Sequence, residues 1–134
     1  MKTPAEAQQI TQAMLDDTIS FFGGPEGWTT RSPEPADSCT VQGHEGVSYY
    51  WIQQGPGTGS DAARDDSAKR LVERLKAQGY TAYIAKGKPN DPLARVYADG
   101  GAVADFSAYI SAEYINIRAE SWCVTGTDTP APTP

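Results

Sequence analysis

One histidine stands beside a carboxylate, the pairing that general acid–base catalysis uses. His44 and Glu45 are flanked by Gly43 and Gly46, and an imidazole next to a carboxylate can act as a general base. His44 is the only histidine of the chain, and no nucleophile accompanies it in a recognisable motif. The simpler interpretation is a solvated hairpin tip. We therefore expect no catalytic residue.

Two other segments resemble ligand-binding motifs in part. Asp61, Asp65 and Asp66 form a loose group of acids, but an EF-hand loop needs acids at alternating positions and a closing glutamate. Acids in the first turn of a helix are favoured by its dipole, which explains this group better. Residues 55–60 are glycine-rich, yet they lack the Gly-Lys-Ser/Thr ending of a phosphate-binding loop and the glycine spacing of a dinucleotide site. We expect no metal site and no cofactor.

The two cysteines, Cys39 and Cys123, are more than 80 residues apart. They cannot form a CxxC redox motif, and two thiolates with one histidine are too few for a structural zinc site. Two unrelated thiols or one long-range disulfide remain. We expect the disulfide, which implies an oxidising compartment.

A larger set of polar and aromatic residues alternates along the second half of the chain. Side chains of a strand point alternately to its two faces, so those on one face recur at every second position. If the helices cover the face that contains Ile115 and Ile117, the opposite face gathers Tyr83, Arg95, Tyr97, Asp105, Tyr109, Tyr114, Asn116, Arg118, Glu120 and Trp122. Recognition surfaces are enriched in Tyr, Trp and Arg. Cross-strand pairs that only stabilise the sheet are the alternative.

Two helices are predicted to cover the other face. Thr3-Pro4-Ala5-Glu6 has the pattern of a capping box with proline in the first turn, and Gly23-Gly24-Pro25 ends the apolar stripe that follows. Ser60 or Asp61 begins the second helix, and Gly79 suits the left-handed position after its end.

Strands are predicted over residues 38–42, 47–54, 80–85, 93–98, 102–109 and 113–124. Glycine-containing turns separate the first two strands at residues 43–46 and the fourth and fifth at residues 99–101. The order predicts an α+β domain with one antiparallel sheet of about five to six strands and two helices on one face. Residues 1–124 form this single domain, and the Thr/Pro-rich residues 125–134 are expected to be disordered.

Composition excludes several kinds of partner. The net charge of −6 opposes binding to nucleic acid, which depends on clustered Lys and Arg. No window has the roughly 18 apolar residues that a membrane span needs, and no basic region precedes an apolar run at the N-terminus. We expect a monomer that is either cytoplasmic or preceded by a removed export segment.

The order of several motifs resembles that of small actinobacterial cell-envelope lipoproteins of the LppA-like kind. They are an early helix, Cys39 after a proline-rich stretch, the helix end at residues 75–80, the Gly100-Gly101 hairpin and the closing residues 121–124. The resemblance covers residues 3–124 and implies export and a globular part outside the membrane. The sequence departs from this pattern in having no cysteine near residue 1. Met1 could replace a removed signal segment, so membrane attachment is expected only through a lipid anchor of the full-length precursor. The family offers no catalytic residues to carry over.

Three functions are consistent with the sequence. The first is a non-enzymatic envelope domain that binds a protein or glycan partner through the aromatic and charged face. The second is a small hydrolase that uses His44 with Glu45 or Asp105 and requires a pocket around the imidazole. The third is a cytoplasmic immunity or interaction protein, in which Cys39 and Cys123 would be reduced and apart.

Overall fold

The computed structural model describes residues 2–29 and 36–127. Its elements, in chain order, are α1 (Pro4–Phe21), β1 (Asp37–Val41), β2 (His44–Ser48), β3 (Tyr50–Pro56), α2 (Asp61–Ala77), β4 (Thr81–Ala85), β5 (Ala94–Asp99), β6 (Asp105–Ile110), β7 (Tyr114–Glu120) and β8 (Val124–Thr125). The predicted α+β class is confirmed.

Both helices begin at the predicted caps. The Thr3 hydroxyl accepts a hydrogen bond from the Glu6 amide at 3.2 Å, and the Glu6 carboxylate accepts one from the Thr3 amide at 3.1 Å. These two bonds form the predicted capping box of α1. The Ser60 hydroxyl caps α2 by accepting from the Ala63 amide. Gly79 follows α2 with a φ of 95°, which is the left-handed conformation that glycine favours.

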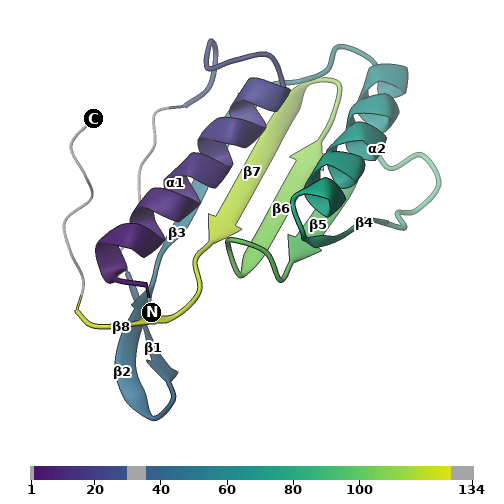
Figure 1. Ribbon diagram of the computed structural model, residues 1–134. Helices are drawn as coiled ribbons and strands as arrows, with labels where there is room; N and C mark the ends of the chain where they lie inside the picture. Colours follow the sequence, from purple (N-terminus) through teal and green to yellow (C-terminus); the bar gives the residue numbers. More distant parts are fainter. Residues whose placement is uncertain (1, 30–35, 128–134) are drawn as a thin grey trace.

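Five antiparallel strands form the large sheet, in the order β3-β7-β6-β5-β4. Both helices lie on the same face of this sheet, with α1 over β3 and β7 and α2 over β4 and β5 (Figure 1). The buried side chains between the layers include Leu15 of α1, Leu71 and Leu75 of α2, and Ile117 of β7. No helix of the described residues is long and apolar enough to cross a membrane.

The antiparallel sheet with two helices on one face agrees with the prediction, but not all the predicted strands belong to it, because two of them divide. The first break falls at Tyr49, between β2 and β3, and the second follows Glu120 at the end of β7. The Ser121 hydroxyl accepts the hydrogen bond of the Tyr49 amide at 2.8 Å. A side-chain oxygen thus replaces the backbone carbonyl that would have continued the ladder. The segments before Tyr49 and after Ser121 lie outside the large sheet. They form a small sheet, in the order β1-β2-β8.

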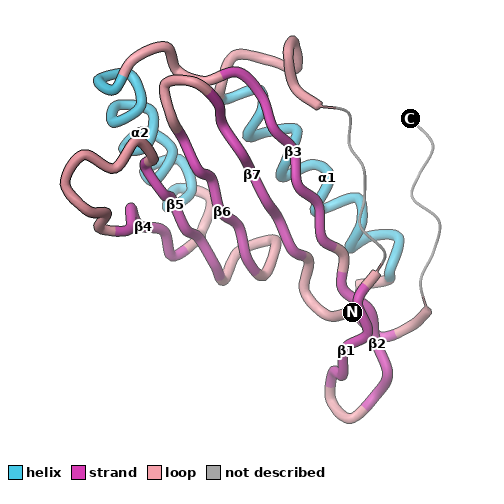
Figure 2. The backbone as a smooth tube through the Cα atoms, turned by 180° about the vertical axis from the view of Figure 1, so that it is seen from behind, coloured by secondary structure: helices cyan, strands magenta, loops and turns pink. Residues whose placement is uncertain are grey.

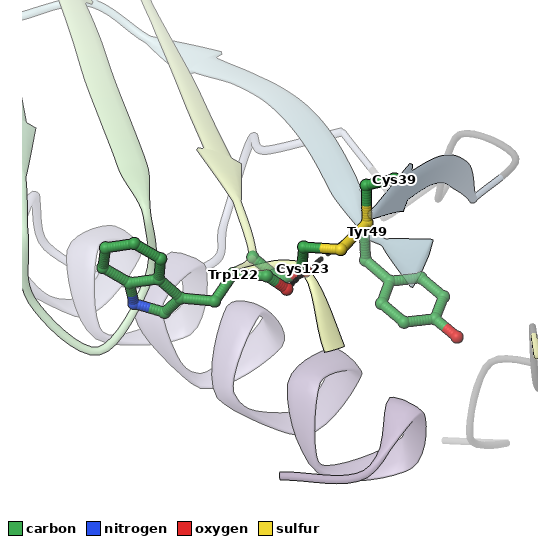
Figure 3. Close-up of a disulfide and its surroundings, with 5 residues drawn as sticks. Cys39, Tyr49, Trp122 and Cys123 are labelled. Carbon is green, nitrogen blue, oxygen red and sulfur yellow. Dashed lines mark hydrogen bonds between the residues drawn. A yellow bond between two sulfur atoms is a disulfide. The ribbon is translucent and has the colours of Figure 1, made fainter. Parts of the chain in front are cut away.

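The predicted disulfide between Cys39 and Cys123 is confirmed. Its sulfur atoms are 2.03 Å apart, and it joins β1 to the segment before β8 (Figure 3). A Cβ atom at Gly46, on β2, would lie 2.9 Å from the Cys123 sulfur. The close approach of the bridge to β2 therefore requires glycine at this position.

The turns and the C-terminal boundary differ in detail from the prediction. The first hairpin turns at Gln42-Gly43, with φ values of 51° and 78°, as a tight two-residue hairpin requires. The second has a longer loop, because Val103 is fully buried and its amide donates to the Tyr80 hydroxyl. Thr125, placed in the predicted tail, pairs with Gly46 in β8. Residues 128–134 of that tail lie outside the described residues.

Candidate binding site

The large sheet has a second face that no helix of the described chain covers, here called the outer face (Figure 2). Strand register aligns its side chains in three rows. The first row contains Asp99, Asp105, Glu120 and Tyr50, the second Tyr83, Tyr97, Ser107, Arg118 and Ile52, and the third Arg95, Tyr109, Asn116 and Gln54. The alternation in the sequence thus becomes a two-dimensional array of polar and aromatic groups.

A shallow depression of ≈300 Å³ lies on this face. Ser107 is the smallest side chain of its row, between Tyr97 and Arg118, and larger side chains surround it. The lining residues are Tyr50, Tyr83, Tyr97, Ala98, Asp99, Asp105, Phe106, Ser107, Tyr109, Arg118, Ala119 and Glu120. Six of them belong to the predicted surface: Tyr83, Tyr97, Asp105, Tyr109, Arg118 and Glu120.

Three tyrosines form a connected group along one side of the depression. The rings of Tyr83 and Tyr97 are 5.8 Å apart, and those of Tyr97 and Tyr109 are 6.1 Å apart in an edge-to-face arrangement. The hydroxyls of Tyr97 and Tyr109 lie 3.2 Å apart, within hydrogen-bond distance. This bond raises the pKa of Tyr97. Tyr83, at 53 % exposure, leaves a large aromatic surface available for contact.

The two arginines of the outer face are in different electrostatic situations. Arg95 and Arg118 both lie over the ring of Tyr109, at 5.8 and 5.3 Å from its centre. Arg95 also pairs with the carboxylate of Asp91. No carboxylate in the described parts of the chain pairs with Arg118, and the buried Nε of Arg118 has no hydrogen-bond partner there. Within the described residues, Arg118 is therefore a cation without a paired carboxylate beside the depression.

Three carboxylates occupy neighbouring positions in the first row. Asp105 is directly opposite Asp99 on β5 and Glu120 on β7. Burial raises the pKa of Glu120, and the negative charges of Asp105 and Asp37 raise it further, while a hydrogen bond with Ser48 lowers it. This end of the depression thus has an excess of negative charge.

Four residues predicted for the surface do not line the depression: Arg95, Tyr114, Asn116 and Trp122. Arg95 and Asn116 stand in the third row. Tyr114 begins β7 and is 37 % exposed beyond the third row, opposite Pro56. Trp122 lies after the end of β7, where the strand alternation no longer applies. Its indole N–H donates to the Gly101 carbonyl at 2.9 Å, and its side chain points away from the disulfide of the next residue (Figure 3).

Six residues of the depression were not predicted. Ala98, Phe106 and Ala119 belong to the buried, helix-covered face, whereas Tyr50, Asp99 and Ser107 belong to the outer face. Asp99 was assigned to a turn, although it is the last residue of β5. The sequence carries no signal for Ser107, because this residue contributes only through its small size. Strand alternation places Tyr50 on the outer face once the predicted strand 47–54 is divided at Tyr49.

His44 is exposed beside the turn of the first hairpin and pairs with Val41 in the small sheet. Asp105, its suggested catalytic partner, is in the large sheet. The two residues thus belong to different sheets, and the exposed imidazole lacks, within the described chain, the enclosing pocket that the hydrolase hypothesis requires. Among the described residues, no three His, Cys, Asp or Glu side chains are grouped so that they could hold a metal ion.

A larger hollow of ≈670 Å³ opens on the helix side, between the end of α1 and the first turns of α2. Phe21, Phe22 and Trp28 line it together with several glycines. Its arginine, Arg70, already packs on Phe21 and pairs with Asp66. Fewer unpaired polar groups converge here than on the outer face, so the depression is the better candidate site.

These features define a disulfide-linked α+β domain with helices on one face of an antiparallel sheet and an open outer face. The fold is similar to that of a DUF4853 family protein from Actinomyces odontolyticus, known from a crystal structure, with a TM-score of 0.57 and 16% sequence identity. The similarity covers 93% of this chain and 67% of that protein. At this identity it shows a shared fold. No protein-family model matches the sequence, and no curated protein matches it either.

Proposed function

We propose that this chain is a non-catalytic, extracytoplasmic binding domain whose outer face recognises a protein or glycan partner. One observation carries the proposal: aromatic and charged side chains converge on a depression that no helix of the described chain covers. Binding sites place a few polar groups among aromatic side chains in a concave surface. An arginine that no carboxylate of the described segments pairs with and three adjacent carboxylates exceed what cross-strand stabilisation requires, since like charges directly opposite each other are unfavourable.

The disulfide supports the extracytoplasmic setting. Disulfides persist in oxidising compartments and are rare in reducing ones, and the bond between Cys39 and Cys123 is the expected consequence of export. The resemblance of the sequence motifs to LppA-like envelope lipoproteins is a second argument for this setting. A cytoplasmic interaction protein remains the alternative, and it requires both thiols to be reduced.

The binding proposal is tested by partner capture from an actinobacterial cell-envelope extract. Immobilised wild type is compared with the double variant Tyr97→Ala/Arg118→Gln, and with the control Arg70→Gln, which removes an arginine of α2 on the helix side of the sheet. We expect the Tyr97/Arg118 variant to lose the captured partner, while the control and the circular-dichroism spectra of all three proteins stay unchanged. Equal capture by both variants would remove the outer face as the binding surface.

The location is tested separately by trapping thiols in living cells. Cells that produce the protein from its native gene are treated with an alkylating agent before lysis, and the mass of the purified protein is measured. We expect both cysteines to be protected from alkylation until a reductant is added. Two alkylated cysteines without reductant would favour the cytoplasmic alternative.

A further inference from the structure

We propose that the depression binds a zwitterionic ligand, with an anionic group on Arg118 and a cationic group on the carboxylates of Asp99, Asp105 and Glu120. The ligand class is that of a peptide or amino-acid end that bears both a carboxylate and an ammonium. This inference rests on the proposed function and specifies what the outer face recognises.

Arg118 has the features of an anion-binding group. A guanidinium presents a planar set of donors that fits a carboxylate with two parallel hydrogen bonds. Packing on the ring of Tyr109, 5.3 Å away, restricts the orientation of this guanidinium before any ligand arrives. Its Nε is buried without a partner among the described residues. Desolvation of this unpaired donor is costly, and the terminal nitrogens of the same guanidinium are the donors that a carboxylate in the depression would meet.

The carboxylates at the other end of the depression would be stabilised by a cation. Asp105 lies between Asp99 and Glu120 in register, and no arginine or lysine of the described chain pairs with any of the three. A bound ammonium would relieve their mutual repulsion. The ring of Tyr50, directly opposite Glu120, lies beside them, and aromatic faces also attract cations.

The two charged ends stay separate because Arg118 leans away from the acids. It stands in the second row, whereas Tyr109, on which it packs, stands in the third, on the side opposite to the carboxylates. Two positions along a strand span roughly 6–7 Å, which is the spacing between Arg118 and Glu120 on β7. Because Arg118 leans away from Glu120, the charged groups are separated by at least this backbone spacing, which suits a ligand whose two charges are several bonds apart, such as the α-carboxylate and side-chain ammonium of an extended lysine. Ser107 leaves room between them for the alkyl chain.

A neutral glycan fits this array less well. It would fill the depression with hydroxyl groups, leaving the net charge at each end uncompensated. The zwitterion neutralises both ends at once, and we therefore favour it over a sugar.

Three small probes separate the two charge contacts. Nα-acetyl-lysine carries both charges, its amide lacks the carboxylate, and Nα-acetyl-norleucine lacks the ammonium. Binding is measured at low ionic strength from the NMR amide shifts of Tyr97, Ser107 and Arg118. We expect Nα-acetyl-lysine to bind at least tenfold more tightly than either of the other two. Equal affinities, tighter binding of a neutral oligosaccharide, no binding of any probe, or shifts confined to other parts of the chain would overturn the proposal.

Variants assign each contact to its side chain. Arg118→Gln should abolish the preference for the acid over its amide, while Asp105→Asn/Glu120→Gln should abolish the preference for lysine over norleucine. The controls are Arg70→Gln and Glu73→Gln on α2, which should retain both preferences. If the probes fail but partner capture still depends on Tyr97 and Arg118, only the ligand class is wrong. If capture does not depend on them, the proposed function itself fails.

Discussion

Glu120 is held in an environment that opposes its own ionisation. Burial and the neighbouring charges of Asp105 and Asp37 raise the pKa of this carboxyl in the folded protein. An acid with a raised folded pKa destabilises the folded state above that pKa, where it is ionised. The penalty decreases as the pH falls through the folded pKa, and it is absent below the pKa of the unfolded chain, where both states are protonated.

Glu120→Gln should therefore increase the free energy of unfolding at pH 7, by about 0.2–1 kcal/mol, the range for directly opposed charges on neighbouring strands. The gain should disappear near pH 3. Urea unfolding of wild type and variant at both pH values measures the difference. Glu113→Gln, an exposed carboxylate just before the same strand, is the control and should show no such pH-dependent gain. A variant that is less stable than wild type at pH 7 would contradict this account of Glu120.

Alternation along the sequence located most of the candidate site at the level of single residues. It placed Tyr97, Asp105, Arg118 and Glu120 on one face because period-2 patterning survives wherever a strand stays regular. It misassigned the environment of Trp122, which follows the end of β7, because a change of backbone direction leaves no mark on the alternation. The size of Ser107 matters only through its neighbours on other strands, which the sequence alone does not specify.

At the scale of elements, the connection between β4 and β5 is fixed by a side chain of α2. Arg64 donates to the carbonyls of Asp91 and Pro92 at 3.2 and 3.1 Å, and its Nε donates to Asp65 at 2.9 Å. Its side chain is only 14 % exposed as a result. The same loop provides Asp91, the partner of Arg95 on the outer face. Through this loop, Arg64 of α2 on one side of the sheet is linked to Arg95 on the outer face.

Arg64→Lys should destabilise the protein by about 1–2 kcal/mol, because a single ammonium cannot replace the several donors of the guanidinium. Hydrogen exchange at Leu93, whose amide donates to Asp91, should accelerate. Arg70→Lys, at a position that is 65 % exposed and has one ion pair at 3.7 Å, should cost less than about 0.5 kcal/mol. Equal losses in the two variants, measured by urea unfolding, would show that Arg64 does not hold this loop.

The elements themselves were predicted to different degrees. The helix starts were found because caps are local: Thr3, Glu6 and Ser60 bond within three residues of their own positions. The division into two sheets was missed because its cause is distant. The Ser121 hydroxyl that interrupts the ladder bonds to Tyr49 across 72 positions of sequence, and a serine within an alternating segment looks like any other polar strand residue.

At the scale of the whole molecule, the disulfide links two parts of the small sheet that are far apart in the sequence. The two cysteines are 84 positions apart, so the bond removes much of the freedom of the unfolded chain. Val47 and Val124 of the small sheet are buried in the same hydrophobic cluster as Trp51 of the large one. Loss of the bond is therefore expected to affect the entire fold.

Cys39→Ser/Cys123→Ser should lower the free energy of unfolding by about 4.5 kcal/mol on a chain-entropy basis. Urea unfolding of the variant, of the oxidised wild type and of the reduced wild type measures the effect. The variant and the reduced protein should behave alike. If oxidised and reduced proteins unfolded at the same urea concentration, the bridge would have no stabilising role.

The start of α1 and the segment after β8 pack against each other. A Cβ atom on Gly126 would lie only 2.9 Å from the ring of Pro4, so the first helix and the last strand of the described residues meet beside the small sheet (Figure 1). A domain whose ends are close together can be spliced into a surface loop of a host protein without forcing that loop open. The domain is thus suited to insertion into a host protein, with both junctions beside the small sheet and the outer face accessible.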